Sequence, residues 1–189
     1  MLAHAQGTPL NASRLAVSRS VSSPTVARYV DLLVDLLLVR RLQPFHANLG
    51  KRLVKVPKIY VRDSGLLHAL LAVPTRNALY DHPIVGASWE GFAIETLVNC
   101  APAWTSSFYY RTSAGAQIDL LLELPRSKLW AIEIKRSLSP KVERGFHIAC
   151  DDLKPARRLV YSGQERVPLP HGVEAVGLFE LAEELTSLT

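Results

Sequence analysis

Two carboxylates and one ammonium interrupt a pair of otherwise apolar segments in the middle of the chain. Residues 118–137 read IDLLLELPRSKLWAIEIKRS, and Asp119, Glu133 and Lys135 stand among Leu and Ile residues. The alternation of side chains along a strand places Glu133 and Lys135 on the face opposite the large apolar residues around them. Because buried carboxylates are costly without a counter-charge, this spacing points to a site that binds a cation.

The length of the turn between the two segments decides whether the carboxylates meet. In an antiparallel hairpin with a three-residue loop at residues 125–127, Asp119 lies opposite Glu133. A loop at residues 126–128 places Asp119 opposite Lys135 instead, and an even-numbered loop turns Asp119 to the other face. Either odd loop therefore predicts one cluster of Asp119, Glu133 and Lys135.

Mg²⁺ or Mn²⁺ is the expected cofactor of such a cluster, because both prefer hard carboxylate oxygens as ligands. Asp119 and Glu133 are the predicted metal ligands. Lys135 would orient a water or stabilise negative charge that develops at phosphorus. The alternative is a surface ion pair between Glu133 and Lys135, with Asp119 facing solvent at the start of a strand.

A third carboxylate comes from residues 86–100, which have the apolar periodicity of a helix. On a helical wheel Glu90 falls inside the apolar arc, whereas Glu95 falls on the polar side. A buried Glu without a partner is costly, so we expect Glu90 to complete the catalytic site. From residue 88 onward the pattern is αβββαβ, which is typical of a mixed sheet with helices on its faces.

The chain before the Pro- and Asn-containing break at residues 74–86 has a different, mostly helical pattern. It predicts a short helix, a turn, a helix with Ser23 as N-cap and Pro24 in its first turn, and two strands around a polar loop. This order is that of a winged helix-turn-helix. We therefore predict two domains, residues 1–80 and residues 81–189.

The first domain also carries a basic segment. Residues 40–62 contain seven Lys and Arg residues and no Asp or Glu, within a chain of net charge +5. Such a segment is typical of nucleic-acid binding, with the helix start meeting base edges and the wing meeting phosphates. Asp31 and Asp35 would repel DNA further along the helix, and a winged helix used for protein contact is the alternative. The predicted DNA-contacting residues are Thr25, Arg28, Lys51, Arg52, Lys55, Arg111 and Arg136.

These motifs resemble known families. Asp119 and the Glu133-Ile134-Lys135 triplet, preceded by Glu90 on a helix, resemble the D…(D/E)xK signature of the PD-(D/E)xK nuclease-like superfamily. The chain resembles the C-terminal part of the DUF4143 family of prokaryotic AAA-type ATPases over about residues 10–163. The segments that carry this resemblance are SSPTVARYVDLLVDLLLVRRLQPF, VKVPKIYVRDSGLLHALL, GASWEGFAIETL, FYYRTSAGAQID and WAIEIKRS.

The resemblance implies an α/β (α+β) protein, with a winged helix followed by a restriction-endonuclease-like αβββαβ domain. It implies a Mg-dependent DNA endonuclease as the activity. The family pattern often reads Glu-x-Asp where this chain has Gln117-Ile118-Asp119, so one carboxylate is missing here. The alternative function is a non-catalytic DNA-binding or partner-docking module of an AAA-type ATPase.

No G-x-x-x-x-G-K-[ST] motif occurs, so we expect neither a bound nucleotide nor ATPase activity from this chain. DNA and an ATPase domain or chain are the predicted partners, and the helical face of residues 30–39 is a candidate for homo-oligomerisation. No apolar run approaches the roughly 20 residues that cross a bilayer. With no secretory signal and only Cys100 and Cys150, we predict a cytoplasmic protein without membrane partners.

Overall fold

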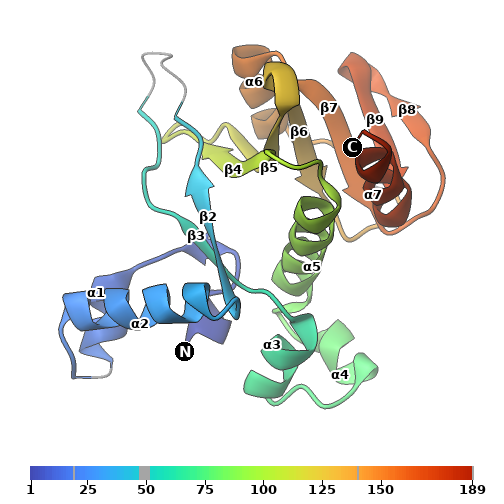
Figure 1. Ribbon diagram of the computed structural model, residues 1–189. Helices are drawn as coiled ribbons and strands as arrows, with labels where there is room; N and C mark the ends of the chain where they lie inside the picture. Colours follow the sequence, from blue (N-terminus) through green and yellow to red (C-terminus); the bar gives the residue numbers. More distant parts are fainter. Residues whose placement is uncertain (19, 47–51, 140, 189) are drawn as a thin grey trace. The chain divides into compact units, whose positions relative to one another are not determined.

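The computed structural model describes residues 1–18, 20–46, 52–139 and 141–188 (Figure 1). In these residues the chain is a mixed α/β protein with seven α-helices and nine strands, hydrogen-bonded in the order β1-β3-β2-β4-β5-β6-β7-β9-β8. The chain divides into two compact units. The first comprises residues 1–42 and 56–92, and the second comprises residues 43–55 and 93–189.

The first unit contains helices and a small antiparallel set of strands. Its elements are a 3-10 helix (Leu2–Ala5), β1 (Thr8–Pro9), α1 (Ala12–Val17), α2 (Ser23–Asp35), most of β2 (Val39–Pro44), β3 (Lys58–Val61), α3 (Ser64–Leu70), α4 (Arg76–Asp81) and the first half of α5 (Val85–Cys100). Both β1 and β2 pair antiparallel with β3. One buried apolar cluster joins α1, α2 and the strands through Ala16, Val26, Val30, Val39 and Ile59. The predicted order of helix, turn, helix and two strands is therefore observed.

Helix α2 begins slightly differently from the prediction. Ser22 is the N-cap, because its Oγ accepts a hydrogen bond from the backbone N–H of Thr25 at 3.2 Å. Ser23, the predicted N-cap, is already helical, and Pro24 lies in the first turn as expected. The prediction was one residue late because either serine of the Ser22-Ser23 pair has the side chain that a cap requires.

The basic segment forms a shorter pair of strands than its sequence suggested. Residues 39–42 of β2 pair with residues 58–61 of β3. Residues 52–54 run instead along the end of β4 (Ser106–Arg111) in the second unit, where Leu53 forms a bridge with Thr112. Most of the predicted loop, residues 47–51, lies outside the described residues.

The second unit is built around a mixed sheet. Its elements after α5 are β4, β5 (Gln117–Leu124), a 3-10 turn (Pro125–Ser127), β6 (Lys128–Ile134), α6 (Arg144–Leu153), β7 (Ala156–Tyr161), β8 (Val167–Leu169), a 3-10 turn (Pro170–Gly172), β9 (Val173–Gly177) and α7 (Leu178–Ser187). β4, β5 and β6 are antiparallel neighbours, β6 is parallel to β7, and β7 is parallel to β9. The predicted αβββαβ order and the mixed sheet are confirmed, and β8, β9 and α7 extend them.

Helices α6 and α7 pack on opposite faces of this sheet. Leu121 of β5 and Leu159 of β7 lie in one buried cluster with Phe146 of α6. Arg158, the neighbour of Leu159 and therefore on the other face, reaches Glu184 of α7 at 3.4 Å.

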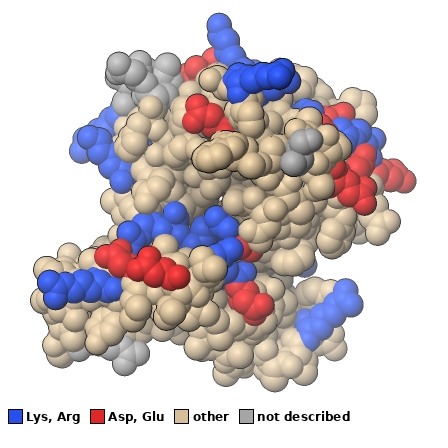
Figure 2. Space-filling view, in the orientation of Figure 1, with Lys and Arg blue, Asp and Glu red and all other residues tan. Residues whose placement is uncertain are grey.

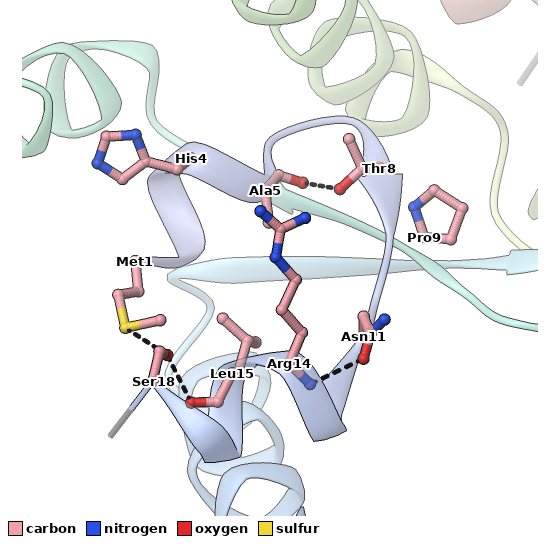
Figure 3. A pocket seen from close by; sticks show the side chains of 9 residues that line it. All are labelled: Met1, His4, Ala5, Thr8, Pro9, Asn11, Arg14, Leu15 and Ser18. Atoms are coloured by element: carbon pink, nitrogen blue, oxygen red, sulfur yellow. Dashed lines mark hydrogen bonds between the residues drawn. The ribbon is translucent and has the colours of Figure 1, made fainter. Parts of the chain in front are cut away.

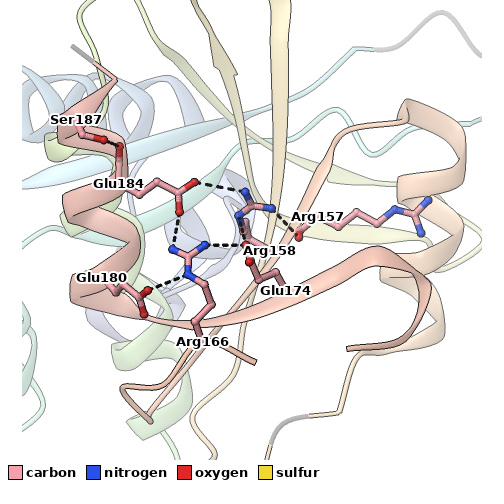
Figure 4. A network of polar contacts seen from close by, with 7 residues as sticks. All are labelled: Arg157, Arg158, Arg166, Glu174, Glu180, Glu184 and Ser187. Carbon is pink, nitrogen blue, oxygen red and sulfur yellow. Dashed lines mark hydrogen bonds and ion pairs between the residues drawn. The ribbon is translucent and has the colours of Figure 1, made fainter. Parts of the chain in front are cut away.

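A network of ion pairs fastens α7 to the sheet (Figure 4). Arg166 lies 2.8 Å from Glu180, 2.8 Å from Glu174 and 2.7 Å from Glu184. Hydrogen bonds to Glu180 and Glu184 raise the pKa of Arg166 well above its ordinary value. The guanidinium therefore joins β9, through Glu174, to two turns of α7.

Candidate functional site

The hairpin of β5 and β6 has the register that sets two carboxylates face to face. Its loop is the 3-10 turn Pro125–Ser127, and Leu120 pairs with Ile132. Continued by one residue, this register would pair Asp119 with Glu133. Of the two odd-numbered loops that the sequence allowed, residues 125–127 and residues 126–128, the structure confirms the first.

The two strands separate where these carboxylates lie. Pairing of β5 with β6 ends at Leu120 and Ile132, whereas β6 continues to pair with β7 through Ile134. Asp119 takes the place of the missing backbone partner, because its Oδ2 accepts a hydrogen bond from the Ile134 N–H at 3.0 Å. Asp119 is therefore held at the carboxyl end of β6, the end at which open α/β sheets bind ligands.

Glu133 is the buried acid of the site, with only 3% of the residue exposed. Its Oε1 lies 3.0 Å from Lys135 Nζ, while the buried Oε2 has no hydrogen-bond partner. Burial raises the pKa of Glu133 to about 7; the hydrogen bond from Lys135 lowers it, and the charges of Asp119 and Glu143 add to the rise. A buried carboxylate oxygen without a donor is costly, and a cation beside it would remove that cost.

Lys135 lies between two carboxylates, Glu133 and Glu143. Burial lowers the pKa of Lys135, but hydrogen bonds to Glu143 and Glu133 outweigh burial and raise it to about 12. Glu143 is the N-cap residue of α6 and makes no capping hydrogen bond with its side chain, which contacts Lys135 instead. The sequence reasoning missed Glu143, although an acidic residue just before a helix is a recognisable helix-start signal.

A close backbone contact sets the position of α6 beside β5. A Cβ atom on Gly145, in the first turn of α6, would lie 2.6 Å from the carbonyl oxygen of Gly115. Glycine is needed there because no side chain fits between the helix and the turn that precedes β5. The contact brings the N-terminal end of α6, where the helix dipole favours anions, to the start of β5.

Glu90 lies on α5 as predicted, within the first unit. Its Oε1 accepts hydrogen bonds from the Tyr60 hydroxyl at 2.6 Å and from Lys58 Nζ at 3.1 Å. Both donors belong to β3 of the same unit, so the half-buried carboxylate has its counter-charge there. The structure brings Asp119, Glu133 and Lys135 together in the second unit, and a role for Glu90 beside them stays a prediction.

Three predicted DNA-contacting residues lie on adjacent backbone segments of the second unit. The Val54 N–H donates to the Arg111 carbonyl at 2.9 Å, and the Ser113 N–H donates to the Arg52 carbonyl at 2.9 Å. Arg52, Lys55 and Arg111 are exposed. The structure therefore gathers these three cations, which are far apart in the sequence.

One of these cations, Arg111, pairs with the strand that carries Asp119. Arg111 pairs with Gln117 in the β4–β5 ladder. The register shifts between Ile118 and Leu121 of β5, and Tyr110, Ile118, Leu121 and Ala131 lie in one buried cluster. Arg111 follows Tyr110, and Glu133 lies two residues after Ala131, so the Arg111 and Glu133 side chains are on opposite faces of the sheet.

The remaining predicted DNA-contacting residues are scattered. Thr25 and the exposed Arg28 lie on α2 of the first unit, and the Thr25 hydroxyl hydrogen-bonds Ser22 Oγ at 2.8 Å. Arg136 is exposed two residues after the end of β6, and Lys51 lies outside the described residues. Figure 2 shows Lys and Arg side chains in several separate groups, with acidic side chains beside most of them.

A pocket of about 500 Å³ opens in the first unit between the 3-10 helix, β1 and α1 (Figure 3). Arg14 and His4 are its basic lining residues, and its other lining side chains are apolar, hydroxyl or amide groups. The backbone N–H of Arg14 donates to the Asn11 side chain at 2.9 Å. Because its lining contains no carboxylate, this pocket lacks the ligands that Mg²⁺ or Mn²⁺ prefers.

The described residues contain no group of three or more His, Cys, Asp or Glu side chains that could hold a metal ion. Asp119 and Glu133 as ligands of Mg²⁺ or Mn²⁺ stay a prediction. Two carboxylates suffice for Mg²⁺, which usually keeps several waters and takes its other ligands from substrate phosphates. The free Oε2 of Glu133 fits such an ion. None of the described helices is long and apolar enough to span a membrane.

Fold and site together define a mixed α/β protein with a D…ExK cluster at the end of a central strand. The chain belongs to the DUF4143 family, described as a domain of unknown function, which matches residues 85–181, just over half of the chain. Residues 1–77 match a second domain of unknown function, DUF8612. The expected resemblance to DUF4143 over residues 10–163 is therefore correct for the second part of the chain, and DUF8612 matches the first.

Two mycobacterial proteins are similar to this chain. They are Uncharacterized protein Rv2008c of Mycobacterium tuberculosis and Uncharacterized protein Mb2031c of Mycobacterium bovis, each 45% identical over 177 residues. The aligned region covers 93% of this chain and 40% of each relative, so the chain spans less than half the length of these relatives. No solved structure matches the chain.

Proposed function

We propose that this protein is a metal-dependent phosphodiesterase that acts on DNA. The observation that carries the proposal is the convergence of Asp119, Glu133 and Lys135 at the end of β6, with Glu133 Oε2 buried and without a hydrogen bond. The αβββαβ order supports a restriction-endonuclease-like second domain. The order of α1, α2, β2 and β3 supports a winged helix before it.

Each residue of the cluster has a distinct role in this proposal. Asp119 and Glu133 would hold Mg²⁺ or Mn²⁺, and a bound ion would polarise the phosphodiester and activate a water. Lys135 would stabilise the negative charge that develops at phosphorus. Glu143 keeps the Lys135 ammonium charged and oriented, and Glu90 is proposed to complete the site.

The DNA backbone would be bound by the cations that share the unit with this cluster. Arg52, Lys55 and Arg111 form one group beside β4, and Arg136 directly follows the D…ExK triplet. Each phosphate contact releases a condensed counterion, so affinity for DNA should fall steeply as salt rises. Arg52→Ala or Lys55→Ala should weaken binding and flatten this salt dependence.

Cleavage of plasmid, linear, branched and single-stranded DNA, with Mg²⁺, with Mn²⁺ and with EDTA, tests the proposal. We expect metal-dependent cleavage that Asp119→Asn abolishes and Lys135→Met slows by about 100-fold, the usual cost of losing a group that stabilises transition-state charge. Glu123→Gln, a change on the same strand at its other end, is the matched control and should cleave normally. Equal activity of Asp119→Asn and the wild type would assign the cleavage to a contaminant.

A non-catalytic DNA-binding or partner-docking module is the second candidate function. Two observations favour it: Gln117 stands where a carboxylate is common, and Lys135 is already paired with Glu143. In this case DNA binding would be independent of divalent metal, and no DNA substrate would be cut. An ATPase domain or chain is the proposed partner.

A further inference from the structure

The exposed side of α2 carries an apolar stripe. Tyr29 is 63% exposed, Leu32 52% and Leu36 57%, and their spacing of three and four residues places them in one stripe along the helix. The opposite side of α2 packs Val26 and Val30 into the core of the first unit. A helix that is apolar on both sides carries a surface that a partner would cover.

The turn that follows α2 points to the same conclusion. Leu37 is 67% exposed and has a φ of +58°, in the left-handed region where a Cβ atom is disfavoured. Its N–H donates to the Val34 carbonyl and the Leu38 N–H donates to the Leu33 carbonyl, a Schellman motif in which glycine is the usual residue at this position. An exposed leucine here costs backbone strain and gains little packing within its own unit.

An apolar groove of about 220 Å³ lies beside the N-terminal half of the stripe. Val21, Val26, Tyr29 and Val30 are among its lining residues. The groove and the stripe share Tyr29, so they form one continuous apolar surface. A leucine side chain is the kind of group that such a groove accepts.

Two opposite charges flank the stripe on one side. Arg28 and Asp35 are seven residues apart, which is two helical turns, so both point along the same flank of α2. Both are exposed, and neither forms an ion pair with another described residue. Asp31, by contrast, pairs with Arg41 of β2.

We propose that α2 packs antiparallel against α2 of a second copy of this chain, about a two-fold axis near Leu32. In an antiparallel helix pair, like flanks face each other, so Arg28 of each copy meets Asp35 of the other. The same arrangement brings Leu36 and Leu37 of one copy to the groove beside Tyr29 of the other. A parallel pair of helices would make neither contact. Because Arg28 lies in this interface, the proposal takes it out of the set of DNA-contacting residues.

The dimer should be weak. The exposed face of a 13-residue helix is smaller than the roughly 800 Å² per partner that a tight interface buries. A dissociation constant of about 1–100 μM is therefore expected. Sedimentation equilibrium of the full chain, from about 1 μM to about 1 mM, should show a reversible monomer–dimer equilibrium over this range.

Charge exchange tests the antiparallel geometry. Arg28→Asp or Asp35→Arg places like charges opposite each other twice per dimer and should weaken self-association by about tenfold or more. A mixture of the two variants should restore the dimer as a heterodimer, because two acids on one copy then face two arginines on the other. The double variant should also self-associate.

Leucine substitutions test the stripe. Leu32→Ser should weaken association with little change in thermal stability, since the side chain is half exposed. Leu70→Ser, on α3 of the same unit and 59% exposed, is the matched control and should leave association unchanged. A chain that stays monomeric up to about 1 mM, or a mixture of charge variants that fails to pair, overturns the proposal. So does an Arg28→Asp variant that loses DNA binding and keeps wild-type association.

Discussion

Glu133→Gln should make the protein more stable at alkaline pH when divalent metal is absent. Burial raises the pKa of Glu133 from its ordinary 4.5 to about 7, so the folded protein holds this proton more firmly than the unfolded chain does. The stability that this proton contributes is present at low pH and is lost as pH rises from about 4.5 through 7. That interval corresponds to about 3 kcal/mol of unfolding free energy.

Glutamine keeps the shape of the side chain and carries no charge to bury. Lys135 keeps Glu143 as a partner in the variant. At pH 5 the wild-type carboxyl is largely protonated, so the two proteins should differ little. At pH 8 the variant should be more stable by up to about 3 kcal/mol.

Urea unfolding at pH 5, 6, 7 and 8, in EDTA, measures this difference. Glu123→Gln, on the neighbouring strand β5, is the control: its stability difference from wild type should be the same at every pH in this range. A Glu133→Gln variant that is destabilised equally at pH 5 and pH 8 would refute the reasoning, because the carboxylate would then be fully stabilised in the folded protein. Mg²⁺ at about 100 times its dissociation constant should stabilise the wild type by about 2.7 kcal/mol at pH 8 and leave the variant unchanged.

Three further changes test the packing around the sites. Gly145→Ala should lower the unfolding free energy by about 1–3 kcal/mol, because the new Cβ meets the Gly115 carbonyl. Gly86→Ala, with open space at its Cβ, is the control and should not lower it. Chemical unfolding measures both variants. Arg166→Ala should cost about 1–2 kcal/mol, and this cost should shrink in roughly 0.5 M salt because the ion pairs are partly exposed. Leu37→Gly should raise the unfolding free energy of the monomer by about 1 kcal/mol, because it relieves the strain of the left-handed backbone conformation. It should also weaken self-association. A less stable monomer would contradict the assignment of strain.

The β5–β6 hairpin could be predicted from local sequence patterns. Alternating apolar residues on either side of Pro125–Ser127 were enough to predict β5 and β6, because strand periodicity and turn chemistry involve neighbouring residues. The same is true of α5, whose apolar spacing extends over four turns. Short elements at the end of the chain, β8 and β9, were missed because each has too few residues for a period to be seen.

The contacts of Glu90 could not be predicted from local sequence patterns. The wheel placed this acid correctly on the inner arc of α5, but its donors, Lys58 and Tyr60, lie about thirty residues earlier in the chain. Residues 52–54 are a similar case, since they were expected to extend a strand of the hairpin and instead pair with the end of β4. Contacts between distant segments depend on how the whole chain packs, which no window of sequence reports.

By itself the sequence determined the residue types of the site, the strands that carry them and the helix order before them, because these follow from the spacing of neighbouring residues. Only the tertiary structure decided which of two odd loops closes the hairpin, and so which side chain faces Asp119. It also decided that Glu143 contacts Lys135 and that Glu133 Oε2 is buried without a partner. The physical reason is that burial and the pairing of charges depend on the three-dimensional surroundings of each side chain, to which distant segments contribute as much as near ones.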